Sequence, residues 1–205
     1  MNDQALIIFY KNPTLGRVKT RLAATIGNQE ALSAFLHLAD HTRAACDELA
    51  DIEKYVFYSD QVPAEPNTWP ENNYQKRLQI GTDLGQRMKQ AFAELREIGH
   101  THIAIIGTDC PYITPELLQT AFKILKKHDA IIGPSTDGGY YLLGLRCAAP
   151  ELFDDIAWST SQVLPQTLMR IFDLEMSNAL LPTLTDIDEA AEWQAYLSLS
   201  STLAR

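Results

Sequence analysis

The chain of 205 residues has a formal net charge of −9, with 46% hydrophobic and 21% charged residues. A globular protein of this size and composition can bury a full hydrophobic core. The negative charge argues against a protein that binds nucleic acids or anionic membranes, because both partners require a positively charged surface.

The cysteines and apolar runs bear on the cellular compartment. Cys46, Cys110 and Cys147 are widely spaced, odd in number and form no CxxC pair, so they indicate neither a disulfide framework nor a zinc site. No apolar run approaches the roughly 20 residues that a membrane helix requires. The first apolar run follows no basic segment, which favours a strand over a signal peptide. We therefore expect a cytoplasmic protein that binds no membrane.

Short apolar runs alternate along the chain with segments of helical periodicity. In chain order, this pattern predicts a strand at 5–10, a helix at 28–49, strands at 55–59 and 74–80, a helix at 83–98, a strand at 102–107, a helix at 114–127, strands at 130–133 and 140–145, a helix at 161–172, a strand at 176–181 and a helix at 188–199. Strands separated by helical crossovers indicate a mostly parallel sheet between two helical layers. We expect a single α/β domain over residues 1–205, a three-layer sandwich of Rossmann-like type.

A basic loop follows the first predicted strand. Its sequence, KNPTLGRVKTR, places four cations in an acidic chain: Lys11, Arg17, Lys19 and Arg21. Ligands of open α/β sheets bind beyond the carboxyl ends of strands, and the start of a helix attracts anions. Gly16 would let the backbone approach a phosphate closely. The loop therefore predicts a pyrophosphate or triphosphate site, and a solvated basic turn is the alternative. It is not a Walker A loop, because the GxxxxGK[ST] spacing is absent.

Acidic residues occupy two further places where ligands could bind. Asp109 ends an apolar strand in the sequence IAIIGTDCP, and a carboxylate in this position can anchor Mg²⁺ together with phosphate oxygens. A helix-capping or turn aspartate is the alternative. Asp186 and Asp188 precede the last predicted helix, where Asp188 fits an N-cap and Asp186 is freer to reach a metal.

The sequence GPSTDGGYYLLG contains a small-residue loop at Asp137, Gly138 and Gly139. Such a loop could admit an acceptor or a sugar, with Asp137 binding hydroxyl groups. A hairpin turn would give the same pattern.

Three weaker candidates lie at predicted helix starts. Ser159 and Thr160 in a WST sequence could bind substrate or cap a helix. Asp83 could belong to a nucleobase or ribose loop, or it could be an N-cap.

The chain resembles the nucleotide-diphospho-sugar transferase (GT-A) superfamily through five motifs in this order: K-x-P-x-x-G-x-V-K-T-R-L, G-T-D-C-P, D-G-G-Y-Y-L-L-G, W-S-T and L-T-D-I-D. The resemblance covers nearly the whole chain. It is closest to a bacterial family of uncharacterised glycosyltransferases that carry arsenosugar or selenium-associated labels. That family is similar in turn to the guanylyltransferases of molybdenum- and deazaflavin-cofactor synthesis.

The resemblance implies a role for each motif. It places the four cations of the basic loop on the donor phosphates, and Lys19, Arg21 and Asp109 are expected to act in catalysis. Asp109 would bind Mg²⁺ or Mn²⁺ together with Asp186 or Asp188. The loop at 137–139 would lie on the acceptor side. In this chain, KNPTLGRV replaces the Gly-rich LAGG-type loop of many nucleotidyltransferases, which leaves the nucleobase contacts open.

Two activities fit these motifs, each with a nucleotide or nucleotide-sugar and a small-molecule acceptor as partners. The cationic loop favours nucleotidyl transfer, in which pyrophosphate leaves, because cations stabilise the charge on the leaving group. The glycosyltransferase label of the similar family favours glycosyl transfer from a nucleotide-sugar. A non-catalytic nucleotide-binding protein is the third alternative, and a homodimer is left open.

Overall fold

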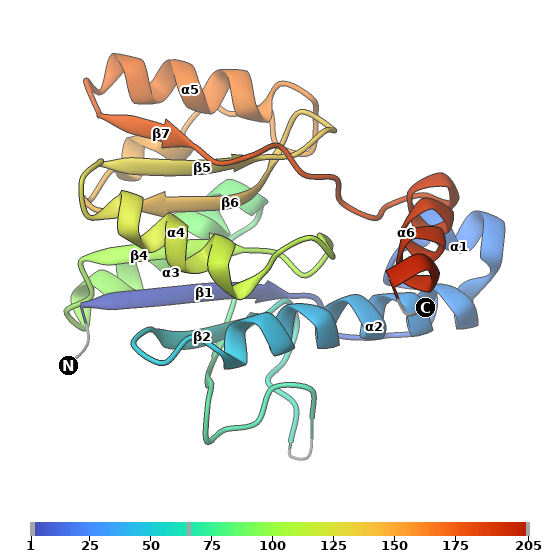
Figure 1. Cartoon of the computed structure of the whole chain (residues 1–205). Helices are drawn as coiled ribbons and strands as arrows, with labels where there is room; N and C mark the ends of the chain where they lie inside the picture. Colours follow the sequence, from blue (N-terminus) through green and yellow to red (C-terminus); the bar gives the residue numbers. More distant parts are fainter. Residues whose placement is uncertain (1–2, 65–66, 204–205) are drawn as a thin grey trace.

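The computed structural model describes residues 3–64 and 67–203, and these residues are organised around a seven-stranded sheet (Figure 1). The strand order is β3-β2-β1-β4-β6-β5-β7. Strand β6 runs antiparallel to both of its neighbours, and the other neighbouring strands pair in parallel. The strands are β1 (Gln4–Tyr10), β2 (Glu53–Tyr58), β3 (Gln75–Leu78), β4 (His102–Ile106), β5 (Ala130–Pro134), β6 (Tyr140–Leu145) and β7 (Asn178–Leu180).

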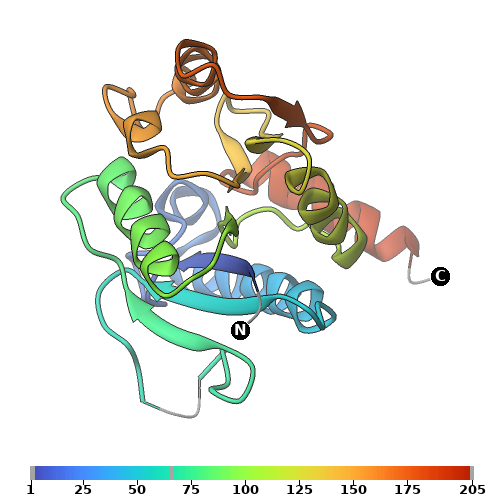
Figure 2. The ribbon, with the colours of Figure 1, turned by 90° about the vertical axis from the view of Figure 1, so that its left-hand side faces the viewer.

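Helices cover both faces of the sheet, as Figure 2 shows in a view from one end. They are α1 (Thr20–Ile26), α2 (Asn28–Asp47), α3 (Leu84–Glu97), α4 (Pro115–Leu125), α5 (Val163–Asp173) and α6 (Ala190–Leu203), with a short 3₁₀ helix η1 (Pro150–Phe153). Helices α2 and α4 pack on one face of the sheet, and α3, α5 and η1 pack on the other. None of the described helices combines the length and apolar character needed to cross a membrane.

Strand β1 shows why the sheet has two buried faces. Leu6 and Ile8 belong to the core beneath α2 and α4, whereas Ala5 and Ile7 belong to the core beneath α3 and α5. Successive side chains of a strand point to opposite faces, so an unbroken apolar run is what a central strand between two helical layers requires. The predicted three-layer α/β fold is confirmed.

The structure corrects several predicted boundaries. A separate helix, α1, precedes α2, and Gly27 divides the two with a backbone φ of 87° that favours glycine. The strand expected at 74–80 spans only 75–78. The last helix begins at Ala190 and not at Asp188. Helix α5 begins at Val163, two residues later than expected, because the preceding residues form a turn.

Side chains cap the starts of helices α4 and α3. The side chain of Thr114 accepts a hydrogen bond from the backbone N–H of Leu117, and Pro115 is the first residue of α4. Asp83 accepts a hydrogen bond from the backbone N–H of Gln86 at the start of α3. Each cap satisfies a backbone donor that the helix itself leaves unpaired.

The close packing of β5 against β6 leads to a stability prediction. A Cβ atom on Gly133 would lie 2.3 Å from the ring of Tyr141. That ring cannot move freely, since Tyr141 is buried and its hydroxyl donates to the carbonyl of Pro182 over 3.0 Å. We expect Gly133→Ala to lower the free energy of unfolding by about 1–3 kcal/mol, the usual cost of overpacking. Urea denaturation measures this change.

Gly107→Ala is the matched control, because no atom outside the neighbouring residues lies within 4 Å of the added Cβ. It should change the free energy of unfolding by less than about 1 kcal/mol. Equal effects of the two substitutions would contradict the proposed packing constraint.

Candidate functional site

A cavity of about 570 Å³ lies at the carboxyl ends of the parallel strands β1, β2, β3 and β4. It is lined by Lys11, Ser59 and Gln79, which directly follow β1, β2 and β3, and by Asp109, which lies shortly after β4. This is the edge at which open α/β sheets bind their ligands. The cavity brings together six of the predicted site residues, namely Lys11, Lys19, Arg21, Asp109, Asp186 and Asp188.

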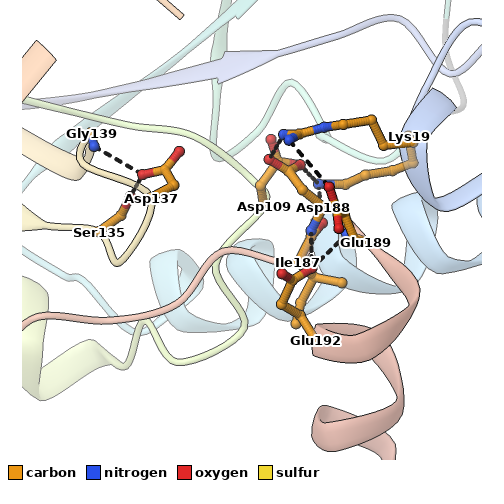
Figure 3. A network of polar contacts seen from close by, with 10 residues as sticks. Lys19, Asp109, Ser135, Asp137, Gly139, Ile187, Asp188, Glu189 and Glu192 are labelled. Carbon is orange, nitrogen blue, oxygen red and sulfur yellow. Dashed lines mark hydrogen bonds and ion pairs between the residues drawn. The ribbon is translucent and has the colours of Figure 1, made fainter. Parts of the chain in front are cut away.

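Lys19 lines the cavity and contacts two of its carboxylates. Figure 3 shows these contacts. The ammonium group of Lys19 lies 2.5 Å from Oδ1 of Asp109 and 3.2 Å from Oδ1 of Asp188. It also donates a hydrogen bond of 2.6 Å to the carbonyl oxygen of Ile187. The side chain is only 3% exposed, so three segments far apart in the sequence meet around one buried cation.

Arg21 binds the carboxylate of Asp188 from the solvent side. Its guanidinium lies 2.5 Å from Oδ2 of Asp188 and 3.6 Å from Glu189, and the arginine side chain is 63% exposed. Both oxygens of Asp188 therefore have a cationic partner. Of the two predictions for Asp188, an N-cap or a metal carboxylate, the N-cap is wrong, because α6 begins at Ala190 and the side chain of Asp188 lines the cavity.

The segment that carries Asp186 and Asp188 is fixed by backbone hydrogen bonds. The N–H of Ile187 donates to the carbonyl of Asp109 over 2.9 Å. The carboxylate of Glu192 accepts from the N–H groups of Asp188 and Glu189 (Figure 3). Glu192 lies in the first turn of α6, where an acidic side chain satisfies free N–H groups. The start of α6 thus positions the acidic segment against Asp109.

Asp186 lies near other acidic side chains of the site. Burial, and to a smaller extent the nearby carboxylates Asp109, Asp137 and Asp188, together raise the pKa of its carboxyl to about 7, while Lys19 acts in the opposite direction. Burial and nearby like charges both disfavour the ionised form of a carboxyl group. The ionised form of the Asp186 carboxyl is therefore disfavoured despite the nearby Lys19. No three His, Cys, Asp or Glu side chains are grouped as a ready-made metal site in the part of the chain that the structure describes.

Two of the predicted site residues in the basic loop do not line the cavity. Gly16 and Arg17 are exposed, and they lie in a turn in which the N–H of Arg17 donates to the carbonyl of Thr14. Gly16 has a φ of 74°, so the conformation of the turn is sufficient to explain why a glycine occupies this position.

The predicted acceptor loop forms the hairpin between β5 and β6. The carboxylate of Asp137 accepts from the hydroxyl of Ser135 and from the N–H of Gly139, as Figure 3 shows. Gly138 has a φ of 90°, and a Cβ there would lie 2.5 Å from the carbonyl oxygen of Ser161. This loop packs on the segment before α5 and does not line the cavity.

Local turns also account for the three remaining candidates. The hydroxyl of Thr160 donates to the carbonyl of Ala157 over 2.7 Å, and Ser159 has a positive φ of 62°. Asp83 caps α3. None of the three lines the cavity.

The structure adds Ser59 and Gln79, which the sequence interpretation missed, and it places in the cavity Arg87, which belongs to the predicted nucleobase or ribose loop of Asp83. The guanidinium of Arg87 donates to the side-chain oxygen of Gln79 over 3.2 Å and to the carbonyl of Gly81 over 3.1 Å. Ser59 and Gln79 directly follow β2 and β3, but the predicted strands at 55–59 and 74–80 include both residues, so the misplaced strand ends hid them.

Residues 42–160 match a family described as "Uncharacterized protein conserved in bacteria (DUF2064)". The fold also matches the crystal structure of a protein named as a nucleotide-diphospho-sugar transferase, from Desulfovibrio desulfuricans G20. That match has a TM-score of 0.85 and 31% identity, and it covers 92% of this chain and 84% of the other.

A curated relative is the 2-phospho-L-lactate guanylyltransferase of Methanocaldococcus jannaschii, which is 28% identical over 138 residues. The match covers 64% of this chain and 56% of the relative, so the chain spans about half the length of the curated relatives it matches.

The inositol-1-phosphate CTP transferase of T. maritima shares the fold alone, with a TM-score of 0.60 and 12% identity over 93% of this chain and 91% of the other. These matches confirm the resemblance that the five motifs indicated. The chain belongs to the bacterial DUF2064 family and has the fold of the nucleotide-diphospho-sugar transferases.

Proposed function

We propose that this protein is a metal-dependent nucleotidyltransferase that transfers a nucleotide from a nucleoside triphosphate to a small acceptor. The observation that carries the proposal is the cavity, in which Lys11, Lys19 and Arg21 lie beside the carboxylates of Asp109, Asp186 and Asp188. Cations and carboxylates together suit a triphosphate bound with a divalent metal. The similarity to named guanylyltransferases supports this choice.

The acidic residues fit a bound Mg²⁺ or Mn²⁺. Asp109 and Asp188 have side chains 47% and 34% exposed, so their oxygens are accessible from the cavity. Burial is the main cause of the raised pKa of Asp186, and a divalent cation beside this carboxyl would favour its ionised form. Mg²⁺ usually takes one or two carboxylates together with substrate phosphates. We assign the metal to Asp109 with Asp186 or Asp188, where it would neutralise phosphate charge.

The residues of this chain then have distinct roles in the reaction. An oxygen of the acceptor attacks the α-phosphorus of the nucleotide, the bond from this phosphorus to the bridging oxygen breaks, and pyrophosphate leaves with the electron pair. Lys11, Lys19 and Arg21 stabilise the negative charge that builds on the leaving group. Lys19 and Arg21 are paired with carboxylates in the structure, so phosphate binding requires them to exchange partners.

The acceptor would lie on the side of the hairpin between β5 and β6. The N–H of Leu164, at the start of α5, donates to the carbonyl of Gly138 over 2.9 Å, so this hairpin and the segment with Ser159 and Thr160 form one packed unit. We propose that Asp137, with Gly138 and Gly139, and the hydroxyl groups of that segment face the acceptor after it binds.

The cysteines support a cytoplasmic location. Cys46, Cys110 and Cys147 are free. Burial raises the pKa of the Cys46 and Cys110 thiols to about 12, so both stay protonated and unreactive. Such thiols are typical of a reducing compartment.

Glycosyl transfer is the second candidate, because the protein from Desulfovibrio desulfuricans G20, at 31% identity, is named as a nucleotide-diphospho-sugar transferase. In that reaction a hydroxyl group attacks the sugar and a nucleoside diphosphate leaves. The same cations would then contact the diphosphate.

Phosphorus NMR separates the two reactions. We expect pyrophosphate to appear when the protein is incubated with Mg²⁺, each nucleoside triphosphate and pooled small acceptors that carry phosphate or carboxylate groups. The Asp109→Asn variant is the control and should release none. Release of nucleoside diphosphate from a nucleotide-sugar, with no pyrophosphate from any triphosphate, would replace our proposal with the second candidate.

A further inference from the structure

We propose that Lys19 is an internal counter-cation of the carboxylate pair Asp109–Asp188, and that its ammonium group must leave this pair before a divalent metal can bind there. This inference rests on the proposed function, since it concerns the metal of that site. It predicts that metal and phosphate bind cooperatively, because the phosphate supplies a new partner for the displaced lysine.

The contacts of Lys19 carry the first step of the argument. Its ammonium group lies against Oδ1 of both Asp109 and Asp188, at 2.5 and 3.2 Å (Figure 3). A metal held by the same pair of aspartates would have to share these oxygens and would be repelled by the ammonium charge at close range. The second oxygen of Asp188 is taken by Arg21 at 2.5 Å. In this structure the pair is therefore already neutralised by the chain itself.

Burial makes this arrangement specific to Lys19. The Lys19 side chain is 3% exposed, whereas Lys11 and Arg21, which line the same cavity, are exposed. A charge removed from water requires close partners, and Lys19 has three: Asp109, Asp188 and the carbonyl of Ile187. An exposed lysine would add only to the average potential of the cavity, but Lys19 blocks particular oxygen atoms.

The backbone of Lys19 is held in an unusual conformation, whereas its side chain can move. Lys19 precedes α1 with φ of 47° and ψ of 46°, a left-handed conformation that residues other than glycine rarely adopt. Such conformations persist where the surroundings impose them, and they cluster at ligand sites. The side chain of lysine has four flexible methylene groups, so its ammonium can swing from the carboxylates towards a phosphate without a rearrangement of the sheet.

These observations describe an exchange of partners. Without nucleotide, the lysine satisfies Asp109 and Asp188 and the metal binds weakly. When a pyrophosphate group enters with its metal, the ammonium pairs with phosphate oxygens and the metal takes the carboxylates. Lys19 is thus a positioning residue for the metal, in addition to its proposed contact with the leaving group.

Binding of Mn²⁺ alone, measured by electron paramagnetic resonance on the whole chain without nucleotide, tests the inference. We expect Lys19→Met to bind Mn²⁺ at least about tenfold more tightly than the wild type, because the competing cation is gone. Lys11→Met is the matched control, since it removes the same charge from the same cavity without freeing a carboxylate. It should change the affinity by less than about threefold, because an exposed charge is screened.

Adding inorganic pyrophosphate extends the test. It should tighten Mn²⁺ binding to the wild type by a larger factor than it tightens binding to Lys19→Met, because the variant has no lysine to displace. Equal factors in the two proteins would overturn the inference.

Two further variants keep the result interpretable. Lys19→Gln keeps a donor for the carbonyl of Ile187 and replaces Lys19→Met if the latter does not fold, as judged by circular dichroism. Asp109→Asn in the Lys19→Met background should remove the gain in Mn²⁺ affinity. The inference is overturned if Lys19→Met binds Mn²⁺ no more tightly than Lys11→Met, or if neither wild type nor variant binds it. In either case pyrophosphate release still decides the proposed function separately.

Discussion

Replacement of Asp109 by asparagine is expected to weaken metal-dependent nucleotide binding by about 100-fold or more, because even partners one step removed from a metal contribute roughly 10–100-fold to its affinity. The asparagine keeps the shape of the side chain and removes its charge. The fold should persist, since Asp109 is 47% exposed and the buried ammonium of Lys19 keeps Asp188 and the carbonyl of Ile187 as partners. Isothermal titration with a nucleoside triphosphate, with and without Mg²⁺, measures the effect.

Asp173→Asn provides the control, because this aspartate is exposed on α5 and does not line the cavity. It should leave nucleotide affinity and its metal dependence unchanged. If Asp109→Asn binds nucleotide with the metal dependence of the wild type, the assignment of the metal to Asp109 is wrong.

The fold could be predicted from the sequence because its central strands are apolar without interruption. Strands β1 and β4 lie side by side between two helical layers, so almost every side chain on them is buried. A strand buried on both faces is recognised by its continuous apolar run, so no alternation of apolar and polar residues is needed to predict it. The predicted ends of a strand were wrong where the strand lies at the edge of the sheet, as for β3. Strand β3 has no fully buried residue, and its apolar pattern therefore gave poor limits.

Part of the candidate site followed from the same reasoning. Lys11 directly follows β1 and Asp109 lies shortly after β4, and parallel strands end at a common edge, so sequence position alone places them in one cavity. The pairing of Lys19 with Asp109 and Asp188 could not be predicted this way. It depends on a left-handed backbone at Lys19 and on how the start of α6 meets β4.

Small-residue and capping motifs were the least informative. The DGG sequence at 137–139 serves the β5–β6 hairpin, and Asp83 serves the start of α3. A turn, a cap and a ligand loop all favour Asp and Gly, since each needs a short polar acceptor or a positive φ. Only the contacts of the folded chain separate these uses. For Arg17 and Arg21, four positions apart in one basic loop, the structure makes a distinction that charge does not.

That distinction leads to a prediction for phosphate binding. Arg21→Glu is expected to weaken triphosphate binding by about 100-fold, because it removes charge-assisted hydrogen bonds of roughly 1.5–3 kcal/mol and adds a repulsive carboxylate. Arg17→Glu makes the same change of charge on the same loop, but Arg17 is exposed and does not line the cavity. It should weaken binding by less than about fivefold, through the screened long-range field alone.

Isothermal titration of each variant with the triphosphate that binds the wild type, and with the nucleoside that lacks its phosphates, measures both effects. The nucleoside should bind all three proteins equally, because Arg21 acts on phosphate oxygens. Thermal melting monitors the fold, since the new glutamate would lie beside Asp188 and Glu189, which Arg21 now contacts. Similar losses for Arg17→Glu and Arg21→Glu would mean that the net charge of the loop, and not the position of Arg21 in the cavity, attracts the phosphates. An equal loss for nucleoside and triphosphate would show that Arg21 does not contact phosphate at all.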